Sequence, residues 1–164
     1  MRVFMSEFLY KNRGIITAFL GVLLLVFPPS PFECIGIPFL IAAVFLRIWA
    51  RMHIGEHSRG SELACPEIVK TGPYKYINHP LYLSNFMAGG ALALFHTGFS
   101  KETLAFCAIY AIFLTYLAKK ENTFLKSCPM SHVPCPKPSF IKDYPTWLWQ
   151  IAMLILIVLR KHHG

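Results

Sequence analysis

The sequence predicts an all-α, multispan integral membrane helical bundle with four to five transmembrane helices. Two observations lead to this fold class. Hydrophobic residues make up 55% of the 164-residue chain and charged residues only 15%, whereas a soluble domain carries about 25% charge. The apolar residues also come in blocks and not at amphipathic spacing. The length suits one membrane-embedded domain, residues 1–164.

Five apolar runs mark the expected helices. They cover residues 14–27, 32–50, 81–97, 103–118 and 146–159. A spanning helix needs roughly 20 residues, so these runs reach both interfaces only if flanking side chains extend toward water. Tyr10, Arg13, Arg51 and Lys119 are the expected flanking residues. The first four runs are predicted to span, whereas the last either spans or lies in the interface.

Short polar or small-residue segments separate and shape these runs. The segment 98–102 reads as a turn, in which Ser100 is expected to cap the next helix. Small residues in the segment 87–91 predict close packing between helices. Five cysteines at irregular spacing do not suggest a disulfide framework.

The positive charges predict the orientation of the chain. The net charge of +8 comes from residues that flank apolar runs, which favours contact with membrane lipids and argues against nucleic acid as a partner. If the spans alternate, all 16 lysines and arginines except Lys101, Arg160 and Lys161 fall on one side. That side should be cytoplasmic, in a cell (inner) membrane. Functional chemistry is then expected from two cytoplasmic segments, residues 51–83 and 119–142.

The most informative segment is residues 71–83, which read TGPYKYINHPLYL. Gly72-Pro73 is typical of a turn. His79 puts a titratable ring directly before Pro80, which is suited to the first position of a helix. Aromatic residues at a membrane interface would account for part of this pattern. The density of the motif favours a ligand-binding loop at the membrane surface.

This motif, Gly-Pro-Tyr-x-Tyr-x-x-His-Pro-x-Tyr over residues 72–82, resembles the signature of the isoprenylcysteine carboxyl methyltransferase family and its phospholipid-methyltransferase relatives. These are small multispan membrane enzymes that use S-adenosylmethionine. Three features depart from the family pattern. Asn78 stands where the family has arginine, and Asn122 follows Glu121 where the family has a second acid. The aromatic-Gly-x-x-Tyr tail of the family is replaced by residues 126–132.

The resemblance implies an S-adenosylmethionine-dependent methyltransferase that acts on a lipid-like or small carboxylate, thiol or amine acceptor. The cofactor-binding residues it implies are Gly72, Tyr74, His79, Pro80, Tyr82, Glu121 and Asn122, and the substrate-side candidates are Arg59 and Asn78. The chemistry of these residue types agrees. Glu121 can pair with the amino group or a ribose hydroxyl, and tyrosine rings suit an adenine or a sulfonium.

Two other functions stay open at this point: a sterol-reductase-like enzyme that uses NADPH, and a non-catalytic membrane scaffold or binding protein. A metal site is a further alternative, because His53, Glu56 and His57 fit the inverted zinc-peptidase pattern. Gly55 weakens a helix there, and the sequence offers no convincing third ligand. We therefore expect no metal.

Overall fold

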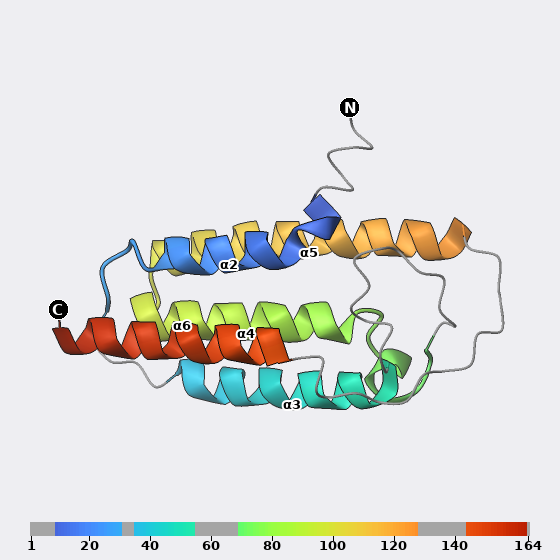
Figure 1. Cartoon of the computed structure of the whole chain (residues 1–164), viewed down its shortest axis with the longest axis horizontal. Coiled ribbons are helices and arrows are strands. Elements are labelled where there is room, and N and C mark those ends of the chain that lie inside the picture. Colours follow the sequence, from blue (N-terminus) through green and yellow to red (C-terminus); the bar gives the residue numbers. More distant parts are fainter. Residues whose placement is uncertain (1–8, 31–34, 55–68, 128–143, 164) are drawn as a thin grey trace.

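The computed structural model describes residues 9–30, 35–54, 69–127 and 144–163 (Figure 1). The elements are α2 (Arg13–Leu24), α3 (Gly36–Ile54), the short 3₁₀ helix η2 (Gly72–Lys75), α4 (Pro80–Thr97), α5 (Lys101–Ser127) and α6 (Tyr144–His163). No strand occurs in these ranges. The predicted all-α fold class is therefore confirmed for the part of the chain that the structure describes.

Two of these helices are long and apolar enough to cross a membrane, namely α3 and residues 101–123 of α5. The apolar helix α2 is shorter, with 12 residues. Large apolar side chains point outward from the bundle: Phe45 on α3 is 69% exposed and Ile112 on α5 is 70% exposed. This surface fits a helical membrane protein, because lipid can cover what water would not. The number of four to five spans stays a prediction.

The helices run roughly along one common axis, with α4 in the middle of the bundle (Figure 1). Helix α4 packs against α3, α5 and α6, and α6 also contacts α2. Two clusters of buried side chains hold this arrangement. The first contains Tyr10, Tyr110, Leu114 and Leu117, and the second contains Leu92, Phe95, Met153 and Ile157. The second cluster joins α6, through Met153 and Ile157, to Leu92 and Phe95 of α4.

Small residues let the helices approach closely, as the sequence predicts for the segment 87–91. A Cβ added to Gly89 would lie 2.6 Å from a ring carbon of Tyr110 on α5. A Cβ added to Gly36 would overlap the backbone of Ala91 on α4. Larger side chains at these positions would push α3 and α5 away from α4.

The boundaries of α4 and α5 follow the local sequence. Pro80 begins α4, where its missing amide hydrogen costs nothing. Gly98 ends the helix with a φ of +63°, a conformation that favours glycine. The Ser100 hydroxyl then accepts a hydrogen bond from the Thr103 amide at 3.2 Å. The predicted cap of α5 is therefore confirmed.

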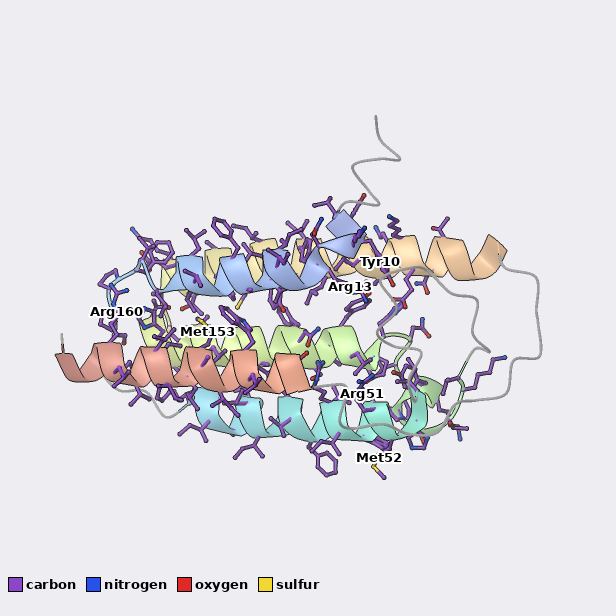
Figure 2. All side chains as sticks on the ribbon, in the orientation of Figure 1. Tyr10, Arg13, Arg51, Met52, Met153 and Arg160 are labelled. Atoms are coloured by element: carbon purple, nitrogen blue, oxygen red, sulfur yellow. The ribbon has the colours of Figure 1, made fainter. Side chains whose placement is uncertain are left out.

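The polar end of α3 differs from the prediction. Helix α3 continues to Ile54, so Arg51 and His53 are helical and not part of a cytoplasmic loop. Arg51 is only 3% exposed and lies on the inner side of α3, whereas Met52 lies on the outer side (Figure 2). Tyr10 is also buried, at 7% exposed. The expectation that these two flanking side chains extend toward water is wrong, because both pack into the polar end of the bundle.

Candidate functional site

Four segments meet at one end of the bundle: the last turn of α3, the helix η2, the first turn of α4 and the last turns of α5 (Figure 1). They carry most of the residues that the sequence predicts for a cofactor site. Helix α5 continues through residue 127, so Glu121 and Asn122 are helical.

The η2 turn begins with Gly72, which has a φ of +58°. A Cβ at this position would overlap the ring of His53, so both the backbone conformation and the available space require glycine. His53 Nδ1 lies 3.1 Å from Thr71 Oγ1. The predicted turn at Gly72 and Pro73 is present, and it rests directly on the end of α3.

Tyr74 projects from η2 into the polar end. Its hydroxyl is buried and has no hydrogen-bond partner among the described residues. Burial raises the pKa of Tyr74 above its usual range, the negative charge of Glu121 adds to this, and Arg51 and Arg47 oppose it. Tyr74 is therefore a neutral phenol at physiological pH, with a donor and an acceptor available for a ligand.

His79 precedes the first turn of α4 and faces two side chains of α5. Its Nε2 lies 3.0 Å from Asn122 Oδ1, and its Nδ1 lies 3.6 Å from Glu121 Oε2. His79 and Asn122 are 43 residues apart in the sequence. The side chains of His79 and Glu121 are 19% and 32% exposed. The three predicted residues thus form one partly open polar cluster.

Tyr82 and Pro80 complete the predicted set on α4. The Tyr82 side chain lies near the Glu121 carboxylate, and its ring lies 5.5 Å from the His79 ring between centroids. Pro80 is buried and fixes the start of the helix one residue after His79. Glu121 therefore lies near two residues of the motif at once.

An aromatic and basic group borders Glu121 on the side of α2. The Arg13 guanidinium lies 4.3 Å from the centroid of the Tyr10 ring, and Lys120 Nζ lies 5.5 Å from it. Figure 2 shows Tyr10 and Arg13 at the beginning of α2, beside α5. The sequence identified both residues only as flanking residues of a span. Their contact with the α5 segment could be found only from the packing.

A buried arginine, Arg47, links three helices next to the polar end. Arg47 is 6% exposed and donates to Asn85 Oδ1 at 2.6 Å and to Thr146 Oγ1 at 3.1 Å. These contacts join α3, α4 and α6. Sequence reasoning did not single out Asn85 or Thr146. The available signal was the charge of Arg47 inside an apolar run, which indicates a functional or paired position in a membrane protein.

The structure describes only one of the two substrate-side candidates. Asn78 is exposed beside His79. Arg59 lies outside the described residues, and so do Glu56 and His57 of the possible metal pattern. Within the described ranges, no group of three or more His, Cys, Asp or Glu side chains could hold a metal ion.

An apolar groove of about 270 Å³ lies between α4 and α5 and begins at the polar end. Its lining residues are Tyr82, Leu83, Phe86, Ala111, Leu114, Thr115 and Ala118. Tyr82 thus borders both the polar cluster and the groove. Residues 111 to 118 span about 10 Å along a helix, so the groove runs from the site toward the middle of the bundle.

The arrangement combines groups that suit a polar ligand beside a surface that suits an apolar one. A carboxylate, an amide, an imidazole and two phenols converge at the polar end. Such a set can bind amino, hydroxyl and carboxylate groups of a ligand. The adjoining groove can accept a hydrocarbon chain.

Comparisons with known proteins agree with the motif. The chain matches the model of the isoprenylcysteine carboxyl methyltransferase (ICMT) family over residues 34–127, which is more than half of its length. The match includes α3, η2, α4 and α5 and leaves out α2 and α6. Comparisons with curated proteins and with solved structures give no match. The matched segment contains every element of the polar cluster, and the chain belongs to the isoprenylcysteine carboxyl methyltransferase family of membrane methyltransferases.

Proposed function

We propose that the protein transfers a methyl group from S-adenosylmethionine to a lipid-like or small carboxylate, thiol or amine acceptor at the cytoplasmic membrane face. One observation carries the proposal. His79 of the family motif and Asn122 of α5 are 43 residues apart in the sequence but lie 3.0 Å apart in space. Two segments that the resemblance assigns to one cofactor site therefore do converge.

The residues present fit the polar groups of this cofactor. The Tyr74 hydroxyl is buried without a protein partner in the described residues, which suggests a ligand as its partner. Glu121 offers a carboxylate for a cationic amino group or a ribose hydroxyl, and His79 can donate to an oxygen. When bound, S-adenosylmethionine supplies a methyl group activated by a sulfonium.

The task of the protein side chains is then mainly to hold and orient. Rigid helices fix His79, Tyr82 and Glu121 relative to each other, which favours in-line transfer by keeping reacting groups in one geometry. A carboxylate acceptor needs no general base, because it is already anionic. A thiol or an amine would need a proton acceptor, and Glu121 and His79 are the groups in the cluster able to serve.

The groove between α4 and α5 supports an acceptor with an apolar chain. It is lined mainly by apolar side chains and reaches Tyr82, which lies near Glu121. A hydrocarbon chain in this groove would bring its polar end toward the cluster. An acceptor that enters from water would gain about 0.8 kcal/mol for each methylene buried, whereas the chain of a lipid already in the bilayer would mainly be positioned by the groove.

The proposed topology is multi-pass, with four to five spans and the polar cluster on the cytoplasmic side. Basic residues support this side: Lys70, Lys75, Lys119 and Lys120 are near the segments that form the cluster. Positive charge is enriched in cytoplasmic loops of membrane proteins. Labelling of cysteines introduced at residues 75 and 99 in intact cells would test it, since the two positions should react from opposite sides.

Calorimetric titration of the detergent-solubilised protein with S-adenosylmethionine, or with its demethylated product, tests the cofactor. We expect binding by the wild type, a large loss in His79→Ala and no loss in Tyr76→Ala, because Tyr76 is 75% exposed in the same segment. A wild type that does not bind, or a His79→Ala variant that binds equally well, would overturn the proposal. Dependence on reduced nicotinamide without any response to S-adenosylmethionine would favour the reductase alternative.

A further inference from the structure

The last turn of α3 makes a specific contact with the beginning of η2. His53 Nδ1 shares a hydrogen bond with Thr71 Oγ1 at 3.1 Å. The ring occupies the space where a Cβ of Gly72 would lie, and the ring atoms closest to that space are Cδ2, Nε2 and Cγ. One edge of His53 therefore faces the hydroxyl of Thr71, and another faces the backbone of Gly72.

The contact with His53 lies directly at Gly72, whose backbone conformation is unusual. Gly72 has a φ of +58°, and the chain then makes a single 3₁₀ turn. Glycine is flexible in the absence of other contacts, so nothing intrinsic to Gly72 selects this φ. The ring of His53 and its bond to Thr71 hold the turn against α3 from two directions.

The turn determines where Tyr74 lies. Tyr74 follows Gly72 by two residues, and its amide donates to the Thr71 carbonyl oxygen at 3.2 Å. Two further bonds continue the turn: the amides of Tyr76 and Ile77 donate to the Pro73 carbonyl oxygen. A shift at Gly72 would therefore be transmitted to the buried hydroxyl of Tyr74.

We propose that His53 is a positioning residue, whose ring holds the Gly72 turn against α3 and so places Tyr74 in the ligand site. The ligand part of this inference rests on the function proposed above, whereas the contact with the turn does not. His53 would act on binding only through Gly72 and Tyr74. The sequence singled out His53 only as part of a metal pattern, but here Nδ1 bonds to Thr71 and Nε2 faces Gly72.

Hydrogen exchange of the cofactor-free protein tests the contact without any ligand. In His53→Ala we expect the amides of Tyr74, Tyr76 and Ile77 to exchange about tenfold faster, because local opening of the turn costs less. Met52→Ala is the matched control, since Met52 is the neighbouring residue and is 55% exposed on the outer side of α3. It should leave the exchange of these amides unchanged.

A double-mutant cycle then tests the effect on binding. Gly72→Ala should weaken binding of S-adenosylhomocysteine by about tenfold or more, since a Cβ is unfavourable at positive φ and here also overlaps a ring. His53→Ala removes that overlap, so Gly72→Ala should cost clearly less affinity in the His53→Ala background than in the wild type. Gly14→Ala is the control glycine, because its Cβ would meet nothing within 4 Å.

Faster exchange in His53→Ala together with weaker binding and a non-additive cycle supports the proposal. Unchanged exchange overturns it, whether or not the wild type binds the ligand. Faster exchange with unaltered affinity also overturns it, because the turn would then not serve the site. A wild type that binds neither cofactor nor product would instead overturn the proposed function, and the exchange result would still decide whether His53 holds the turn.

Discussion

Two histidines lie at opposite ends of α4, His79 directly before the helix and His96 in its last turn, and they have different surroundings. The side chain of His79 is 19% exposed, and its ring nitrogens face Asn122 and Glu121 of α5. His96 is fully buried, and its Nε2 lies 3.1 Å from the carbonyl oxygen of Phe27. The first histidine has ionisable and amide partners that a ligand can also use. The second is bonded to a backbone group.

The backbone of His96 makes the same connection as its side chain. Its carbonyl oxygen accepts a hydrogen bond from the Ser30 amide at 2.8 Å, so His96 is bonded twice to the segment that follows α2. This end of the bundle holds chain segments together, whereas the end with His79 gathers side chains around a partly open space. The comparison shows that the partners of a histidine, and not its presence on a helix, indicate whether it can serve a ligand.

The largest expected effect is a difference in the free energy of unfolding when each histidine is replaced by alanine. We expect His96→Ala to lower the free energy of unfolding by about 2 to 4 kcal/mol, because it leaves a cavity and removes the partner of the Phe27 carbonyl. His79→Ala should lower it by less than about 1 kcal/mol, since the side chain is partly exposed. Unfolding in one detergent, followed by circular dichroism, measures both. Equal losses would contradict the distinction.

Neutralising the carboxylate at the polar end should weaken ligand binding. We expect Glu121→Gln to reduce the affinity for S-adenosylhomocysteine by about tenfold to a hundredfold, because hydrogen bonds to charged groups contribute about 1.5 to 3 kcal/mol. Glu102→Gln is the matched control at the opposite end of α5 and should bind like the wild type. Calorimetry measures both variants, and equal affinities for the two would argue against a role of Glu121.

Removing the Tyr74 hydroxyl should act on binding and on stability with opposite signs. Tyr74→Phe deletes a buried hydroxyl that has no partner in the described residues, so the ligand-free protein should become equally or slightly more stable. The same variant should bind the cofactor about threefold to tenfold more weakly, because the ligand loses a hydrogen bond. Tyr76→Phe should change neither quantity. A loss of stability in Tyr74→Phe without any change in affinity would show that the hydroxyl has a structural partner.

The smallest expected effect is a difference in stability at alkaline pH. Burial raises the pKa of Tyr74 above the usual tyrosine value of about 10, so the unfolded chain loses this proton before the folded protein does. The titration of Tyr74 therefore leaves the stability of the protein unchanged below about pH 10 and lowers this stability as the pH rises further. Between pH 10 and 11, the stability of Tyr74→Phe should fall less than that of the wild type, by about 1 kcal/mol. If the free energies of unfolding of the two proteins fell equally between pH 10 and 11, the raised pKa of Tyr74 would be contradicted.

Much of the fold could be predicted from the pattern of apolar residues. The five apolar runs overlap the five α-helices from α2 to α6, since each run is long and its breaks contain proline, glycine or charged residues. The end of α3 could not be found in this way. Arg51 and His53 look like loop residues by polarity, and only the packing shows that they face inward on a helix.

Site residues that are close together in the sequence could be predicted, but most contacts between residues of different helices could not. The motif identified His79 and Tyr82 by their spacing, the charge pattern placed their segment on the same side as residues 119–142, and the family resemblance singled out Glu121 within that second segment. The bonds of Arg47 to Asn85 and Thr146 could not be predicted, because no local pattern states which faces of three helices meet. Tyr10 was missed as a neighbour of the cluster for the same reason.

The central claim is that residues 71–82 and the end of α5 form one cofactor site. The most direct measurement is calorimetric titration with S-adenosylhomocysteine of the wild type, His79→Ala, Asn122→Ala and the double variant. Because His79 and Asn122 share a hydrogen bond, we predict that the double variant binds little worse than the weaker single variant. No binding by the wild type, or losses that simply add, would contradict the claim.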